Sequence, residues 1–173
     1  MKLQNMWGLC EAQEAVGVSP DQFHGFIFPY HKQVAELFGK TCYACCEPAD
    51  PYWEDIKTLH NLRRVSVSQW ADWKKMSEYM GRDFVFSYKA SSTNVANDNM
   101  DEDLIHRELA NILDITGYNN VEIVLKDLHT IGIKPEQVLY RDFNIKISKR
   151  SISFFLLMRQ PLLRLKTRLV FGN

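Results

Sequence analysis

The sequence predicts an α/β fold in which four parallel β/α units follow one another along the chain. Two observations predict it. Short apolar runs rich in β-branched and aromatic residues alternate with longer segments whose apolar residues recur at helical spacing. Only short turns separate the two kinds of segment, which is the pattern of parallel strands joined by covering helices.

The first predicted element is a helix over residues 19–39. Ser19 is a suitable N-cap and Pro20 a suitable first-turn residue, and Gly39 is typical of a helix end. Pro29 lies inside the pattern, so we expect it to kink the helix or divide it in two. The apolar residues at helical spacing are Phe23, Phe26, Ile27, Tyr30, Val34 and Leu37.

Four strands and four further helices complete the expected fold. The strands are expected at 41–46, 64–68, 84–88 and 121–125. The helices are expected at about 52–59, 71–80, 101–115 and 135–149. Four units are half of a (β/α)8 barrel. The predicted fold is therefore a partial, TIM-type barrel over residues 1–150, with an extra helix ahead of its first strand.

Residues 151–173 differ in residue pattern from the preceding part of the chain, because apolar clusters alternate there with basic residues. We interpret this tail as the product of a truncated or shifted reading frame. The alternative is an amphipathic segment that binds a membrane surface or a partner. From Phe143 onward the chain has no acidic residue and seven basic ones, which are Lys146, Lys149, Arg150, Arg159, Arg164, Lys166 and Arg168.

Composition limits the partners and the compartment. The chain has 21 basic and 21 acidic residues, and a net charge of zero gives no general reason to bind nucleic acid. No secretory leader is recognisable at residues 1–7, and the longest apolar run is too short to span a bilayer. We therefore expect a cytoplasmic protein whose cysteines are free or metal-bound thiols. These are Cys10, Cys42, Cys45 and Cys46.

Candidate functional residues follow the predicted strands. The carboxyl ends of parallel strands open into loops along one edge of the sheet, where ligands commonly bind. An ordinary loop surface is also polar, so this rim is suggestive only. The residues expected at the rim are Cys45, Cys46 and Glu47; Ser66, Ser68, Gln69 and Trp70; Ser87, Tyr88 and Lys89; Lys126, Asp127, His129 and Thr130.

One chemistry that the rim offers is zinc binding. Thiolates of Cys45 and Cys46, with Glu47 or His129, are ligand types that zinc prefers. Against this, alternation along a strand places Cys45 on the opposite side from Cys42 and Cys46. The alternative to a zinc site is that these thiols are small buried side chains that bind no metal.

The rim also offers acid/base chemistry and substrate binding. Asp127 is placed to orient the imidazole of His129 beside Lys126, as in a general acid/base group; the alternative is that Asp127 caps a solvated turn. Lys89 and Lys126 are candidates to bind substrate carboxylates, or are plain exposed lysines. At the end of the second expected strand, Ser68 and Trp70 could line a pocket for a flat substrate.

Several runs of residues, taken in their order and spacing, resemble the uroporphyrinogen decarboxylase family. More closely, they are similar to the decarboxylase-like proteins found beside corrinoid-dependent methyltransferase systems. The similarity covers about residues 2–147 and corresponds to the C-terminal half of the family's (β/α)8 barrel. The runs are Gln13-Glu14, Gly17-Val18-Ser19-Pro20, Phe28-Pro29-Tyr30, Phe38-Gly39, Cys45-Cys46-Glu47-Pro48, Val65-Ser66-Val67-Ser68 and Leu125-Lys126-Asp127-Leu128-His129-Thr130.

The resemblance implies a zinc site in the methyltransferase branch. That branch binds zinc through a His-x-Cys pair at the strand end matching residues 43–46 and through a later cysteine, and the zinc lowers the pKa of a thiol substrate. This chain has the first cysteine, as Cys45 or Cys46, but Tyr43 or Ala44 replaces the histidine. It has no later cysteine near Asp127. A zinc site here would need other ligands.

For true decarboxylases, the resemblance implies a different chemistry. These enzymes remove acetate carboxyls from a tetrapyrrole without a cofactor, using arginines and an aspartate from the first half of the barrel. The matched region does not include those residues. The family's late Gly-His-Gly turn corresponds to Leu128-His129-Thr130, in which the histidine is kept and the glycines are not.

We therefore expect a member of the uroporphyrinogen decarboxylase family, of the corrinoid-dependent methyltransferase-like branch. Its partners would be a tetrapyrrole or corrinoid substrate, or a protein that carries a corrinoid. The first alternative is uroporphyrinogen III decarboxylation in porphyrin biosynthesis. The second is an inactive fragment, or a half-barrel that associates with itself to cover its sheet edges.

Overall fold

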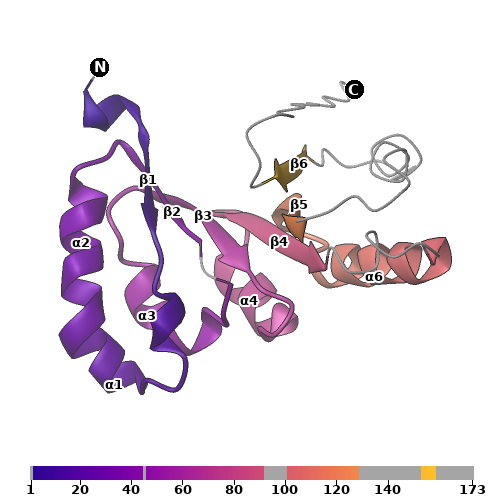
Figure 1. Cartoon of the computed structure of the whole chain (residues 1–173), viewed down its shortest axis with the longest axis horizontal. Helices are drawn as coiled ribbons and strands as arrows, with labels where there is room; N and C mark the ends of the chain where they lie inside the picture. Colours follow the sequence, from indigo (N-terminus) through magenta and orange to yellow (C-terminus); the bar gives the residue numbers. More distant parts are fainter. Residues whose placement is uncertain (1, 45, 92–100, 129–152, 159–173) are drawn as a thin grey trace.

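The described strands of the protein all lie parallel in one sheet (Figure 1). The computed structural model describes residues 2–44, 46–91, 101–128 and 153–158. The strand order in the sheet is the order along the chain. This sequential parallel order is compatible with part of an α/β barrel. The strands are β1 (Trp7–Cys10), β2 (Lys40–Tyr43), β3 (Leu62–Val67), β4 (Val85–Ser91), β5 (Asn120–Leu128) and β6 (Ser153–Met158).

Helices connect the consecutive strands from β1 to β5, as the alternating sequence pattern predicted. The predicted helix at 135–149 lies outside the described residues. The α-helices are α1 (Pro20–Gln22), α2 (Phe28–Glu36), α3 (Trp53–Ile56), α4 (Trp73–Met80) and α6 (Glu102–Ile115). A π-helical turn, η3 (Phe23–Ile27), joins α1 to α2, and short 3-10 turns are η1 (Leu3–Asn5), η2 (Gln13–Ala15) and η4 (Asp50–Tyr52).

The sheet has two more strands than the sequence predicted. Strand β1 was missed because it has only four residues, one of them a glycine, which is too short for a clear period-two signal. Strand β6 lies within residues 151–173, for which the sequence pattern indicated an unrelated tail, and it pairs in parallel with β5. Two predicted strand ends also differ, since β2 already ends at Tyr43 and β5 continues to Leu128.

The first predicted helix is present but contains one wide turn. Ser19 and Gln22 form a reciprocal cap in which each side chain accepts the other's backbone N–H, both at 3.2 Å. The N–H of Phe28 donates to the oxygen of Phe23, five residues back. Pro29 has no N–H and its ring cannot follow an ordinary α-helical turn. The π-helical turn therefore divides the helix just before Pro29, as expected.

One face of the sheet carries the hydrophobic core. Each described α-helix of eight or more residues contributes to this core, and the helices lie along one side of the sheet (Figure 1). Burial of these apolar side chains is the main favourable term in folding. The strands contribute Cys10, Tyr43, Val65, Val67, Phe86, Tyr88, Ala90 and Ile123, and the longer helices contribute Phe28, Ala35, Met76, Met80, Ile105, Leu109 and Ile112.

The other face of the sheet has a different character. Because side chains alternate along a strand, the neighbours of the core residues point to the opposite side. On β1 these are Trp7 and Leu9, which are 51% and 55% exposed. Further along the sheet they are mostly polar or charged, namely Cys42, Arg64, Ser66, Ser87, Lys89 and Glu122. We call these six residues the polar face.

Candidate functional site

The predicted thiols Cys45 and Cys46 and the carboxylate of Glu47 follow β2 in the sequence. Cys46 and Glu47 lie in the turn after the strand, half-buried, and Cys46 is a free thiol. Cys45 and His129 lie outside the described residues. Within the described ranges, no group of three His, Cys, Asp or Glu residues is placed to hold a metal ion. The zinc site therefore stays a prediction.

Ser68 and Trp70 have different environments at the end of β3. The Ser68 hydroxyl accepts a hydrogen bond from the Trp70 backbone N–H at 3.2 Å, and its carbonyl accepts one from Trp73 Nε1 at 2.9 Å. Ser68 is buried and shapes the turn that leads into α4. Trp70 is 70% exposed, so its ring is accessible at the rim.

The acid/base group predicted after β5 is placed differently from our expectation. Lys126 and Asp127 were expected in a loop after the strand, but both lie within β5, which ends at Leu128. The turn that Asp127 would cap in the alternative interpretation lies beyond residue 128, outside the described residues, so that alternative also stays a prediction. The partner expected for it, His129, is not among the described residues, so the pairing of Asp127 with His129 stays a prediction.

Sequence reasoning named Ser66, Ser87 and Lys89 of the polar face as rim residues but missed Arg64 and Glu122, which interact there. Arg64 Nε lies 2.5 Å from Glu122 Oε2, an ion pair that links β3 to β5. Arg64 Nη2 donates to the hydroxyl of Ser87 at 3.1 Å, on the strand between them. The side chain of Glu122 is only 9% exposed and that of Arg64 30%, so water screens this pair weakly.

Strand register explains how these residues come together. Cys42 pairs with Arg64, Ser66 with Ser87, and Ser87 with Glu122. Residues paired on neighbouring strands have side chains on the same face of the sheet. The signal was present in the sequence, because Arg64, Ser66 and Ser68 alternate with Val65 and Val67. From the sequence, that alternation predicted a strand but not the ion pair formed by Arg64.

The polar face contains a hydrogen-bonding group with no partner. Ser66 is 1% exposed, and its hydroxyl makes no hydrogen bond within the described part of the chain. A buried hydroxyl without a partner is costly, so buried polar groups are normally satisfied by protein, water or a ligand. Water or a ligand at this face would satisfy Ser66 Oγ.

The electrostatic balance of the polar face is positive. Arg64 and Lys89 carry two positive charges against one negative charge on Glu122. Both cations act on Cys42 and favour its thiolate, while Glu122 opposes it. Burial outweighs these charges and raises the pKa of the Cys42 thiol above its ordinary value. Cys42 is thus a neutral thiol near pH 7, and the six residues together have one uncompensated positive charge.

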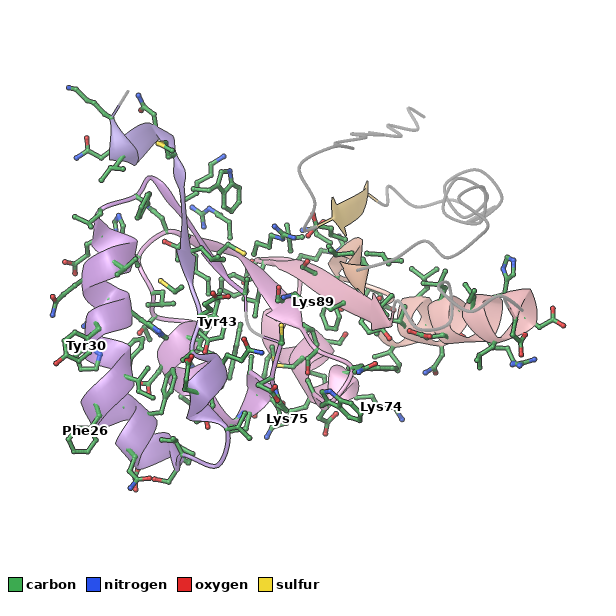
Figure 2. The ribbon with its side chains drawn as sticks, viewed as in Figure 1. Phe26, Tyr30, Tyr43, Lys74, Lys75 and Lys89 are labelled. Atoms are coloured by element: carbon green, nitrogen blue, oxygen red, sulfur yellow. The ribbon has the colours of Figure 1, made fainter. Side chains whose placement is uncertain are left out.

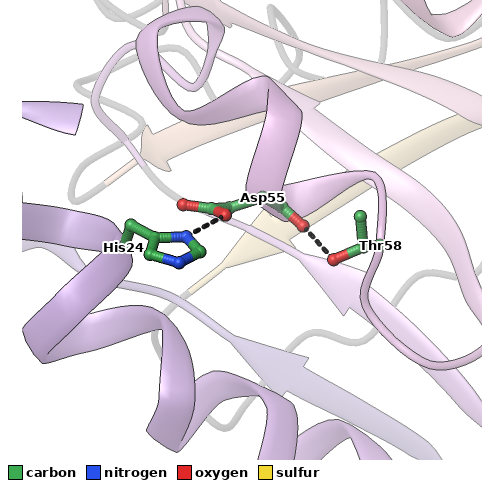
Figure 3. Close-up of polar contacts among 3 residues, drawn as sticks. All are labelled: His24, Asp55 and Thr58. Carbon is green, nitrogen blue, oxygen red and sulfur yellow. Dashed lines mark hydrogen bonds and ion pairs between the residues drawn. The ribbon is translucent and has the colours of Figure 1, made fainter. Parts of the chain in front are cut away.

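A second polar contact lies on the helical side of the molecule (Figure 3). His24 Nδ1 lies 2.7 Å from Asp55 Oδ1, and the Thr58 hydroxyl donates to the backbone oxygen of Asp55 at 2.8 Å. His24 belongs to the π-helical turn and Asp55 to α3. We interpret this pair as a tertiary contact that joins the two helices.

The described helices include none with the length and apolar character needed to cross a membrane. Comparisons of the chain with protein-family models, with curated proteins and with solved structures give no match.

Proposed function

We propose that this chain forms part of a uroporphyrinogen decarboxylase-type barrel and that its polar face binds a carboxylate group of the substrate. The observation that carries the proposal is the unpartnered hydroxyl of Ser66, buried on the same face as Arg64 and Lys89. In a barrel the helix-free face of the sheet is the interior, and substrates bind where it opens at the carboxyl ends of the strands. Ser66 and Lys89 lie in the second halves of β3 and β4, toward that end.

The six residues have different parts in binding. Arg64 is held by Glu122 and Ser87, which fixes its guanidinium in place. Lys89 supplies the positive charge that Glu122 does not compensate, and Ser66 supplies a hydroxyl donor. A carboxylate accepts hydrogen bonds from both kinds of group, and bonds of this kind to an ionised group are strong.

A carboxylate-bearing tetrapyrrole or corrinoid is the substrate class that follows. Carboxylate binding is common to the methyltransferase-like branch and to true decarboxylases, so the polar face supports both. We retain methyl transfer as the leading function because of the sequence resemblance and the free thiol of Cys46 after β2. Decarboxylation is the alternative.

Titration of the full chain with uroporphyrin, a porphyrin polycarboxylate, tests the binding proposal. Lys89→Gln should weaken binding about tenfold, because it removes a charged hydrogen bond. The matched control is Lys74→Gln, which makes the same charge change on α4, away from the sheet (Figure 2). Equal loss in both variants, or no binding by the unmodified protein, would overturn the proposal.

Measurement of bound zinc separates the methyltransferase-like function from decarboxylation. The full chain is incubated with zinc sulfate, desalted and analysed for bound metal. We expect bound zinc that Cys45→Ser and Cys46→Ser each remove and that Cys10→Ser does not, since Cys10 is buried on the core side of β1. Absence of stoichiometric zinc in a protein whose thiols are all reduced would exclude the methyltransferase-like function.

A further inference from the structure

His31 is a titratable residue buried between α2 and the carboxyl end of β1. Only 9% of its surface is accessible to solvent. Its Nε2 lies 3.2 Å from the backbone oxygen of Glu11, which can only accept a hydrogen bond, so Nε2 carries a proton and donates it. A neutral imidazole has one ring proton, which leaves Nδ1 as the unprotonated nitrogen.

Nδ1 of this histidine has no partner. The atom is buried and makes no hydrogen bond in the part of the chain that the structure describes. Two aromatic rings lie beside the imidazole, that of Phe23 from η3 and that of Tyr43 from β2, each with its centroid 5.8 Å away. A proton on Nδ1 would place a charge and an N–H donor in this buried site with no acceptor, which is costly.

The groups around the ring do not compensate such a charge. Among the described residues, none forms an ion pair with His31. The titratable neighbours are the thiol of Cys10 on β1 and the phenol of Tyr43 on β2, while Glu11 contributes its backbone oxygen and is itself exposed. Burial lowers the pKa of His31 below 6.5 and outweighs the hydrogen bond to Glu11, which raises it.

His31 also connects α2 to the end of β1. Besides the bond from its ring to Glu11, its backbone oxygen accepts a hydrogen bond from the thiol of Cys10, with 3.6 Å between sulfur and oxygen. We call these contacts of His31 with Cys10 and Glu11 the His31 junction. The backbone oxygen of Cys10 accepts from the N–H of Ala44 at 3.0 Å, where the chain leaves β2. Opening of the junction would therefore loosen the rim at which β1 and β2 end.

We propose that the His31 junction is a pH-sensitive switch, which opens locally at mildly acidic pH and separates α2 from the carboxyl end of β1. Above pH 6.5 the ring is neutral in the closed and the open state, and the junction has its full stability. As the pH falls below 6.5, the open state takes up a proton that the closed state excludes, so acid favours opening.

The opening should be confined to the N-terminal part of the sheet. The contacts of the junction all lie within residues 10–44, whereas α4 packs against β4 and α6 further along the chain. Proteins commonly open in such contiguous units at a lower free energy than global unfolding requires. The proposal concerns the folded chain alone and does not rest on the proposed function.

Hydrogen exchange of the full chain without ligand, followed by mass spectrometry above and below pH 6.5, tests the proposal. After correction for the intrinsic pH dependence of exchange, the opening constant of α2 should rise by up to about tenfold per pH unit, the limit for uptake of one proton. The opening constants of β3 and β4 should stay constant.

His31→Gln should abolish this response, because a glutamine amide can donate to the Glu11 oxygen but does not titrate. The matched control is His24→Gln, which removes a histidine whose side chain is 70% exposed just ahead of the same helix. This control should keep the response of α2. An unchanged opening constant in the unmodified protein, an equal rise in β3 and β4, or a full response in His31→Gln would each overturn the proposal.

A second measurement keeps the test decisive if His31→Gln does not fold. Nitrogen NMR of the histidine rings in the unmodified protein reports which ring nitrogens carry protons. His31 should have a proton on Nε2 alone and should remain neutral in the folded state below pH 6.5. A doubly protonated His31 ring at pH 6.5 in a protein that is still folded would contradict the proposal. Neither measurement includes uroporphyrin or zinc, so its outcome is independent of the binding tests.

Discussion

Arg64 and Glu122 form an ion pair that passes across β4, with 2.5 Å between Nε and Oε2. The pair joins strands that are not neighbours in the sheet. The guanidinium is also fixed beside Ser87 on the intervening strand. Because this contact fixes three strands of the polar face, we expect the stability of the protein to depend on it.

Glu122→Gln should destabilise the protein by about 2 kcal/mol, because it leaves the partly buried Arg64 without its counter-charge. Glu54→Gln is the control, since Glu54 also forms an ion pair, with Lys57, but its side chain is 80% exposed. That surface pair should contribute at most about 0.5 kcal/mol. Urea unfolding measures the loss of stability in both variants. Equal losses would show that the Arg64–Glu122 pair stabilises the protein no more than the surface pair does.

Ser66→Ala should leave stability unchanged or raise it by about 1 kcal/mol, because it removes a buried hydroxyl that has no partner in the described structure. The same substitution should weaken uroporphyrin binding severalfold, since the proposed ligand loses a hydrogen-bond donor. Ser87→Ala provides the contrast: Ser87 accepts a hydrogen bond from Arg64, and its loss should destabilise. Marked destabilisation by Ser66→Ala would mean that this hydroxyl is already satisfied in the folded protein.

Stability should fall as the pH rises from 9.0 to about 11, in part through Cys10. Burial, and then the charge of the Cys42 thiolate, raise the pKa of Cys10 from 9.0 to about 11 in the folded protein. Within this window the unfolded chain releases the Cys10 proton while the folded chain keeps it, so rising pH favours unfolding. The loss should be roughly 2 kcal/mol.

Cys10→Ala isolates this contribution. The variant should show a shallower fall of the unfolding free energy over the same pH range, measured with urea. Cys46→Ala is the comparison, because it removes a thiol that lies half-buried in the turn after β2 and outside the core. An identical pH dependence in Cys10→Ala and in the unmodified protein would contradict the role given to burial of this thiol.

Gly39→Ala should destabilise the protein by about 2 kcal/mol, because the added Cβ overlaps the backbone oxygen of Gln4 and backbone cannot easily move aside. Gly25→Ala tests the same chemical change where the Cβ meets nothing within 4 Å. It should raise stability by about 0.5 kcal/mol by reducing the entropy of the unfolded chain. Thermal unfolding compares the two. Similar effects would show that Gln4 is not packed against Gly39.

Much of the fold was predictable because its signals are local. Ser19 and Pro20 predicted the start of the first helix, and the Ser19 cap is present. The position of Pro29 predicted a break in that helix, and the π-helical turn is the form it takes. The strands that match β3 and β4 were placed to within a few residues, because each has a period-two pattern.

The candidate site was predictable only in part. The rim residues Ser68 and Trp70 do follow β3, and Cys46 and Glu47 do follow β2. By contrast, Lys126 and Asp127 were assigned to a loop, because charges directly after an apolar run are typical of a strand end. Backbone hydrogen bonds to β4 extend β5 past residue 125. The residue pattern of one strand carries no information about the backbone of the neighbouring strand.

By itself, the sequence determined the alternation of strands and helices, the helix caps and the apolar side of each element, since these depend on residues a few positions apart. Tertiary structure alone decided that β1 and β6 join the sheet and that Arg64 meets Glu122. These two residues are far apart in the chain and become neighbours only when the register of three strands is fixed. That register depends on the packing of the whole sheet against its helices.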